Sequence, residues 1–234
     1  MNYESPPSPS SPPEGVREVF DHWARSGRAE GMERNHSEAV SRVLDPLDWG
    51  RGRRVLDLGC GNGYVVRRSA EAGSLLSVGV DLSPEMVARA RERSVGTPRI
   101  HYLCGVFPSP ELEAELLSLA RGAAPDLPPG FDLCFSMEAL YYLPDPDEGL
   151  RALRRLAAPG AILCCGLDFY EEHEESRSWP DDLGLRMHRR TIPEWRRAVE
   201  AAGFVEARAE RTLPSPESGA ASSPATLWLR GLAL

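Results

Sequence analysis

Residues 55–63 read Val-Leu-Asp-Leu-Gly-Cys-Gly-Asn-Gly, and this stretch decides the fold of the chain. Its apolar first half predicts a short buried strand, and residues 64–72, which follow the glycines, predict a helix. The glycines between them can adopt positive φ and carry no Cβ, so a ligand can approach the backbone closely. A strand, a glycine-rich turn and a helix together aim backbone N–H groups at a ligand. We therefore expect a nucleotide-like ligand at this turn.

The spacing of the glycines separates several kinds of nucleotide site. A dinucleotide fingerprint requires Gly-x-Gly-x-x-Gly, whereas here the last glycine comes one residue early, at Gly63. A phosphate loop requires Gly-Lys-Ser/Thr, and the chain contains no lysine, since all 27 of its basic residues are arginine. The alternative without a ligand is an ordinary tight turn between a strand and a helix. Residues 55–63 instead resemble the first motif of the class I S-adenosylmethionine-dependent methyltransferases, and the chain looks like their small-molecule type 11 or type 25 groups.

This resemblance implies an α/β fold, a Rossmann-like, doubly wound and mostly parallel sheet of seven strands with an antiparallel final strand. It also implies S-adenosyl-L-methionine as the cofactor. The alternation of predicted strands and helices along the chain independently favours a parallel sheet with helices on both faces. N-terminal helices are expected to be added to this core.

Length and composition predict one globular domain. The chain has 234 residues, 41% of them hydrophobic and 26% charged, with a net charge of −8. We expect residues 1–14, rich in Pro and Ser, to be a disordered tail, and residues 15–234 to form a single methyltransferase domain. Within it, residues 15–45 are predicted cap helices broken at Gly27, residues 170–190 a lid or pocket wall, and residues 214–224 a loop of low order. Two interpretations of residues 31–36 are open: Met32, Glu33 and His36 lie over the mouth of the ligand site, or the segment is a capped, solvated turn.

Five cysteines without a Cys-x-x-Cys pair favour reduced, buried thiols in a cytoplasmic protein and no metal site. Glu33 and His36 are three residues apart, but the neighbouring sequence offers too few further ligands for zinc. No apolar run is long enough to span a membrane, and no signal pattern opens the chain.

Asp81 follows the second predicted strand, 18 residues beyond Gly63. A carboxylate in that place can accept hydrogen bonds from ribose hydroxyls, and the resemblance implies the same role. The alternative, a helix-capping carboxylate, is weaker because Ser83 already supplies a cap. Val106 stands where the family usually has Asp, which leaves the adenine contact open, although Val106 and Phe107 could still cover the adenine ring. The expected cofactor-binding residues are Asp57, Gly59, Cys60, Gly61, Asn62, Gly63, Asp81, Leu82, Met86, Gly105, Val106, Ser136 and Met137.

The methyl acceptor is expected at residues 136–142, because ligands of parallel sheets lie beyond the carboxyl ends of the strands. A hydroxyl acceptor would need a base, for which Glu138 and His36, or alternatively His22 and His188, are candidates. The expected catalytic residues are Glu138, Tyr141 and His36. The expected substrate-binding residues are the aromatic side chains Trp23, Tyr142, Phe169, Tyr170 and Trp179. Tyr141 and Tyr142 could alternatively only pack beneath a lid.

These aromatic residues favour a flat or cationic small molecule as the methyl acceptor. The negative net charge predicts that nucleic acid is not a partner, and the lack of a long apolar run predicts that a membrane is not one either. Two other functions remain open from the sequence. An RNA or protein methyltransferase should expose a broad groove or a basic stripe, and a non-catalytic S-adenosylmethionine-binding protein is consistent with Val106.

Overall fold

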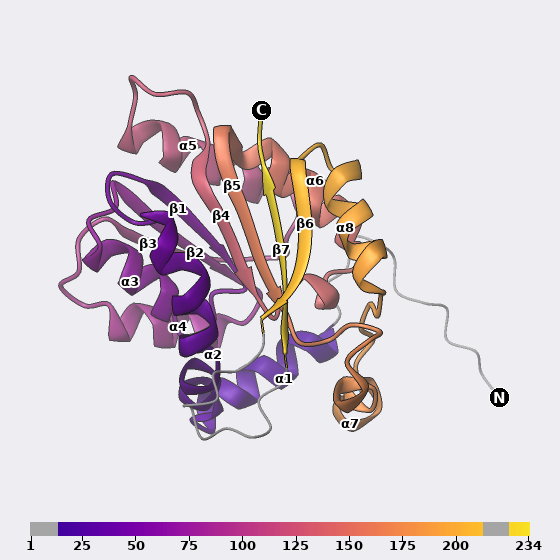
Figure 1. Ribbon diagram of the computed structural model, residues 1–234. Coiled ribbons are helices and arrows are strands. Elements are labelled where there is room, and N and C mark those ends of the chain that lie inside the picture. The colour runs from indigo at the N-terminus through magenta and orange to yellow at the C-terminus, as the bar shows by residue number, and fades with distance from the viewer. Residues whose placement is uncertain (1–13, 213–224) are drawn as a thin grey trace.

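A seven-stranded sheet forms the centre of the computed structural model, which describes residues 14–212 and 225–234 (Figure 1). The strands are β1 Arg54–Leu58, β2 Leu76–Asp81, β3 Ile100–Cys104, β4 Phe131–Met137, β5 Ala157–Leu167, β6 Val205–Thr212 and β7 Thr226–Leu232. Their order is β3-β2-β1-β4-β5-β7-β6. Neighbouring strands from β3 to β5 pair in parallel, and β7 is antiparallel to both β5 and β6. The expected doubly wound sheet with an antiparallel final strand is confirmed.

Helices cover both faces of this sheet. They are α1 Glu14–Arg25, α2 Arg28–Leu44, α3 Tyr64–Glu71, α4 Pro84–Arg93, α5 Pro110–Ala123, α6 Pro146–Leu156, α7 Trp179–Leu183 and α8 Ile192–Ala201. Four of them begin in the same way, with a capping side chain and a proline in the first turn, at Ser83, Ser109, Asp145 and Thr191. Such caps satisfy backbone N–H groups that have no partner inside the helix, so these starts are set by local sequence.

The alternation of side chains along the strands divides the core in two. Val55 of β1 and Phe135 of β4 face one side, where they pack with Val43 and Leu44 of α2. Leu56 faces the other side and belongs to the larger cluster, which also contains residues of α5, α6 and α8. Because both faces are covered, the central strands are almost entirely buried, as a parallel sheet requires.

The two N-terminal helices lie at the end of the sheet toward which β4 and β5 point, and α7 lies at the same end (Figure 1). Gly27 separates α1 from α2 with φ 77°, as the sequence predicted. Of the two interpretations of residues 31–36, the capped turn is wrong, because α2 begins at Arg28 and includes these residues. α1 is fixed to the start of α4, where Asp21 accepts hydrogen bonds from the Ser83 hydroxyl and the Glu85 N–H.

Two expectations fall largely outside the described residues, namely the tail at residues 1–13 and the loop at residues 213–224. Glu14, assigned to the tail from sequence, is the first residue of α1. None of the helices in the described part of the chain has the length and apolar character needed to cross a membrane.

Candidate functional site

The glycine turn between β1 and α3 has a backbone that other residues could not easily adopt. Gly59, Gly61 and Gly63 have φ values of 73°, 51° and 77°. A Cβ at Gly59 would lie 2.3 Å from the Cβ of Ala139, so glycine lets the turn pass directly against the segment after β4. A Cβ at Gly61 would meet no atom within 4 Å. The turn is therefore packed on one side and open on the other, which is the cradle expected for a ligand.

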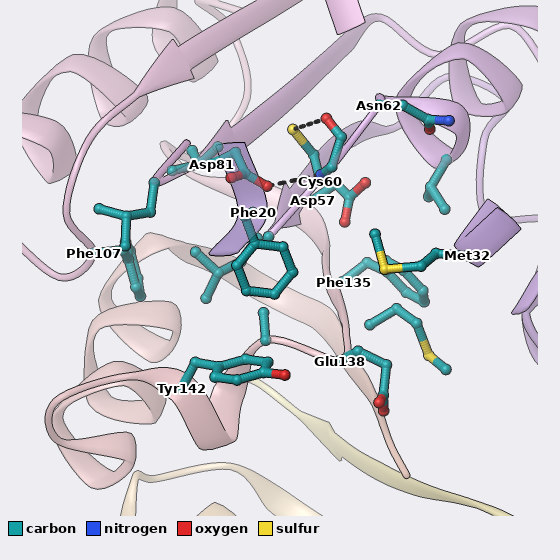
Figure 2. A pocket seen from close by; sticks show the side chains of 18 of the residues that line it. Phe20, Met32, Asp57, Cys60, Asn62, Asp81, Phe107, Phe135, Glu138 and Tyr142 are labelled. Atoms are coloured by element: carbon teal, nitrogen blue, oxygen red, sulfur yellow. Dashed lines mark hydrogen bonds between the residues drawn. The ribbon is translucent and has the colours of Figure 1, made fainter. Parts of the chain in front are cut away.

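A cavity of about 130 Å³ lies over this turn, and we call it the first cavity. Asp57, Cys60 and Asp81 lie on one side of it, and Tyr142 and Glu138 lie opposite (Figure 2). Phe20 of α1 and Met32 of α2 also line it, so the N-terminal helices help to enclose it.

Asp81 holds the turn in place. Its carboxylate accepts hydrogen bonds from the N–H groups of Gly61 at 2.8 Å and Ser83 at 2.9 Å. Burial raises the pKa of Asp81 to about 6, although these hydrogen bonds act in the opposite direction.

Asp57 lines the first cavity beside Cys60, on the side opposite Glu138 and Tyr142 (Figure 2). Burial, and to a smaller degree the charge of Asp81, raises its pKa to about 8. The charged residues that line this cavity within the described chain are Glu33, His36, Asp57, Asp81 and Glu138. Carboxylates held together in this way are stabilised by a cationic ligand. The cavity therefore fits a ligand that carries positive charge.

A second, larger cavity of about 650 Å³ adjoins the first. Trp23, Tyr141, Tyr142 and Trp179 give it aromatic walls. Arg28 also lines it, with its guanidinium 4.1 Å from the centre of the Trp23 ring. Both cavities share the residues Phe20, Met32, His36, Glu138 and Tyr142. A molecule in the second cavity can therefore reach a ligand held in the first.

Polar side chains gather where the two cavities meet. Glu138 accepts a hydrogen bond from the Tyr141 hydroxyl at 2.5 Å and another from the Asp168 N–H at 2.5 Å. His36 Nε2 lies 3.8 Å from Asp168 Oδ2. Desolvation raises the pKa of Glu138 and of Asp168, and it lowers the pKa of His36. Glu138 has φ 58°, a strained conformation for a residue with a side chain, and such strain concentrates at functional sites.

Most of the expected cofactor-binding residues line the first cavity, and three of them do not. Gly63 faces Tyr102, whose hydroxyl would lie 2.3 Å from an added Cβ. Met86 is fully buried against Ala24 and Ala29. Ser136 donates a hydrogen bond to the carbonyl of Leu58 at 2.9 Å and so joins two strands. The close packing at Gly63 and the side-chain contacts of Met86 and Ser136 are therefore structural.

The expected acceptor-site residues divide in the same way. Trp23, Tyr142 and Trp179 line the second cavity, together with the expected catalytic residues Glu138, Tyr141 and His36. Phe169 and Tyr170 line neither cavity. Phe169 is buried and stacks on Trp179 at 6.2 Å between ring centres, so it supports the cavity wall from behind.

Tyr170 is also buried, and its hydroxyl donates a hydrogen bond to the carbonyl of Ala225 at 2.8 Å. The other two base candidates do not line either cavity. His22 is exposed on α1, and the backbone N–H of His188 is bonded to the carbonyl of Tyr141 at 2.8 Å.

Phe20 of α1 lines both cavities, and its helical periodicity in the sequence indicated only packing. Met32 of α2 also lines both cavities, in agreement with the interpretation that places it over the mouth of the ligand site. Asp168 follows β5, where the sequence places it at the carboxyl end of the strand and facing the same crevice, but without a role. Phe107 follows β3 and lines the first cavity, where the sequence allows it to cover the adenine (Figure 2).

The fold and the glycine turn define a class of protein, and comparisons with known proteins agree with it. A family model described as "Methyltransferase domain" matches residues 56–165. The chain belongs to the class I S-adenosylmethionine-dependent methyltransferase family. S-adenosylmethionine is accordingly its cofactor, and the acidic first cavity fits the sulfonium and ammonium groups of that molecule.

The curated relatives of the chain have names that state a particular reaction and substrate. The chain is 39% identical over 122 residues to the tRNA U34 carboxymethyltransferase of Azotobacter vinelandii, covering 52% of this chain and 34% of that protein. It is 33% identical over 172 residues to the enzyme of the same name from Pseudomonas putida, covering 72% of this chain and 50% of that protein. The chain therefore spans about half, or less, of the length of these relatives.

Several solved structures are similar over nearly the whole chain. One of them is the methyltransferase in a complex with the Trm112 methyltransferase activator of Haloferax volcanii. The TM-score is 0.72 at 28% identity, and the match covers 92% of this chain and 97% of that one.

These comparisons correct two expectations. A small-molecule acceptor, and with it the absence of a nucleic-acid partner, is contradicted by curated relatives that are tRNA-modifying enzymes. Net charge is a weak argument against a nucleic-acid partner, because it sums over the whole chain whereas a contact depends on local charge. The lining of the second cavity is itself mixed: it contains Arg28 and Arg42, the latter paired with Glu38, together with the carboxylates Glu138, Asp168 and Asp182.

Proposed function

We propose that this chain is an S-adenosylmethionine-dependent RNA methyltransferase that modifies a nucleotide base of tRNA. The observation that carries the proposal is the second cavity, which has aromatic walls and an arginine and opens directly onto the first cavity. The curated relatives support tRNA as the RNA.

In this proposal the first cavity holds the cofactor, which supplies an electrophilic methyl group. Asp81 accepts hydrogen bonds from the ribose, and Asp57 faces the positive charge of the methionine part. Val106 and Phe107 cover the adenine, because both line the cavity beyond the end of β3. Gly59 and Gly61 let the cofactor lie against the backbone.

The second cavity receives the base, which must leave the RNA stack for its atoms to reach the methyl group. Flipped bases are held between aromatic faces, and Trp23, Tyr142 and Trp179 supply such faces. Arg28 is exposed and has no carboxylate partner within the described residues, so it is free to contact a phosphate. Glu138, Tyr141 and His36 are placed to contact the polar edge of the base.

The chemistry of the first cavity favours transfer of a methyl group over a carboxymethyl group, although the curated relatives carry the latter name. A carboxymethyl donor brings an extra carboxylate, which needs a cationic partner. The described lining of the first cavity contains four carboxylates, one histidine and no arginine. A second carboxylate on the cofactor would be repelled there, so we propose the unmodified cofactor as the donor.

The test is a transfer assay with methyl-labelled S-adenosylmethionine and three acceptor pools, namely unmodified tRNA transcripts, tRNA from cells that lack the gene, and cellular protein. Label is expected in a tRNA pool, and nuclease digestion then locates it in one nucleoside. Label confined to protein, or absent from all pools while the protein binds the cofactor in calorimetry, would overturn the proposal.

A matched pair of arginine variants tests the RNA contact. Arg28→Gln should weaken tRNA binding by several-fold and reduce its dependence on salt, because one phosphate contact is lost. Arg121→Gln, in the last turn of α5, should leave binding unchanged, because this residue lines neither cavity. Equal effects of both changes would argue against the second cavity as the RNA site.

A further inference from the structure

Three side chains that are far apart in the sequence lie close together at the junction of the two cavities. His36 lies on α2, Glu138 follows β4 and Asp168 follows β5. One ligand atom from each lies within 4.8 Å of the ligand atoms of the other two. We call these three residues the junction triad. Its composition, one imidazole and two carboxylates, is a donor set that binds divalent metal ions in proteins.

The two carboxylates of the triad lack a cationic partner other than the histidine. Within the described residues, no arginine forms an ion pair with Glu138 or Asp168. Asp168 is 5% exposed, and its Oδ1 is buried without a hydrogen-bond partner. A buried, unpartnered carboxylate oxygen is costly, and a bound cation would satisfy it.

The triad also faces open space. All three residues line the second cavity, and His36 and Glu138 line the first cavity as well. The strained backbone of Glu138 is held by a hydrogen bond from its N–H to the carbonyl of Gly166 at 2.9 Å. The hydrogen bonds from Tyr141 and from the Asp168 N–H leave each oxygen of Glu138 a free lone pair.

We infer that His36, Glu138 and Asp168 bind a divalent transition-metal ion of the Mn²⁺ type at the junction of the two cavities. Metal–ligand bonds of about 2.1 Å bring ligand atoms to roughly 3–3.5 Å from one another. The ligand atoms of the triad lie within 4.8 Å of one another, so they must approach by up to roughly 1.5 Å on binding. Three protein ligands leave other coordination positions open toward the second cavity. The sequence predicted no metal because His36 has only Glu33 nearby in the chain, and Glu33 instead accepts a hydrogen bond from Asn62.

A role for the ion rests on the proposed function. A carbonyl oxygen of the flipped base that coordinates the ion would be polarised, which makes the neighbouring ring N–H more acidic, and the ion would also fix that oxygen near the methyl group. Metal binding itself does not depend on RNA, cofactor or catalysis, so it can be tested separately.

The experiment is titration of the whole protein with MnCl₂ alone, followed by electron paramagnetic resonance and calorimetry. One Mn²⁺ per chain is expected. Asp168→Asn and His36→Gln should each weaken binding by more than about 10-fold, because even partners outside the first coordination sphere contribute 10–100-fold. Asp182→Asn is the matched control, since this exposed carboxylate lines the second cavity outside the triad and should leave binding unchanged.

Absence of saturable Mn²⁺ binding to the unaltered protein would overturn the inference, and so would equal binding to Asp168→Asn. Circular dichroism shows whether each variant is folded, and the half-buried His36 provides a second test if Asp168→Asn is not. A protein that binds Mn²⁺ at the triad but labels no RNA would refute the proposed function and leave the metal site standing.

Discussion

Replacing Asp57 by Asn should stabilise the protein and at the same time weaken its binding of cofactor. Asp57 is 2% exposed, and burial and the nearby Asp81 raise its pKa to about 8. An unfolded chain would ionise the same carboxyl near its ordinary pKa of about 3.9. Ionising Asp57 in the folded protein therefore lowers the free energy of unfolding, and the uncharged amide of Asp57→Asn avoids this loss.

The size of this cost follows from the pKa difference. A difference of about four units corresponds to ~5 kcal/mol at pH 8, since each unit is ~1.4 kcal/mol. A buried amide without its full set of partners costs about 1–3 kcal/mol, which leaves a net gain of ~3 kcal/mol. For a chain of this size each kcal/mol shifts Tm by about 2–4 °C, so Tm should rise by about 10 °C at pH 8.

The sign of the pH dependence gives a second, independent signature. Because the pKa of Asp57 is higher in the folded state, the native protein binds the extra proton between about pH 4 and pH 8. The contribution of this group to stability therefore falls as the pH rises through that range. At pH 4 only the cost of the buried amide remains, so Asp57→Asn should unfold about 5 °C below the unaltered protein. The difference should change sign as the pH rises and reach about 10 °C in favour of Asp57→Asn at pH 8.

The assay is thermal unfolding of both proteins without cofactor across pH 4–9, with calorimetric titration of S-adenosylmethionine at pH 8. Asp57→Asn should lose about 10-fold or more in cofactor affinity, because a carboxylate facing the cationic part is removed. Asp81→Asn is the control, and no gain in Tm is expected for it, since an amide cannot accept both the Gly61 and Ser83 N–H bonds as well as a carboxylate does. A Tm for Asp57→Asn that is no higher than that of the unaltered protein at pH 8, or a difference that does not change with pH, would refute the reasoning.

Three further predictions concern the ion pair at the amino-terminal ends of β1 and β4, the glycine turn and the proposed ribose contact. The buried Arg54 guanidinium donates hydrogen bonds of 2.9 and 3.1 Å to the Asp132 carboxylate. Asp132→Asn removes this counter-charge, so the free energy of unfolding in urea should fall by about 3–5 kcal/mol. Gly59→Ala should abolish cofactor binding or folding. Gly52 has a similar positive φ but no atom within 4 Å of an added Cβ, so Gly52→Ala should fold and bind normally and lose only about 1–2 kcal/mol in free energy of unfolding. Similar behaviour of the two variants would contradict the close packing at position 59. The affinity for S-adenosylmethionine should rise as the pH increases from 5 to 7, because Asp81, with its pKa of about 6, ionises in this range. In calorimetry, Asp81→Ala should remove this rise in affinity. An unchanged pH profile of the variant would exclude Asp81 as the source of the rise.

The acidic first cavity also explains why the protein tolerates several costly carboxylates. Asp57 and Asp81 both have raised pKa values in the chain without cofactor. A ligand with a sulfonium and an ammonium group offsets that repulsion when it binds. The carboxylates lower the stability of the protein without cofactor and raise its affinity for the cofactor, and the Asp57→Asn variant measures both effects.

Local features were predictable from the chain alone because they depend on neighbours in the sequence. The glycine turn requires positive φ at positions 59, 61 and 63, and the caps at Ser83 and Ser109 fix where helices begin. The alternation of strands and helices then leads to a parallel sheet, since a helix must return the chain to the same edge. Fold, family and cofactor follow from these short-range patterns.

Only the tertiary structure decided which side chains meet. Met86 and Ser136 are close in sequence to residues that line the first cavity, but the rotation of α4 and the pleat of β4 direct them into the core. His36, Glu138 and Asp168 are separated by 102 and 30 residues and meet because α2 crosses the carboxyl ends of β4 and β5. The direction of a side chain depends on packing between distant elements, and a one-dimensional pattern carries no record of that packing.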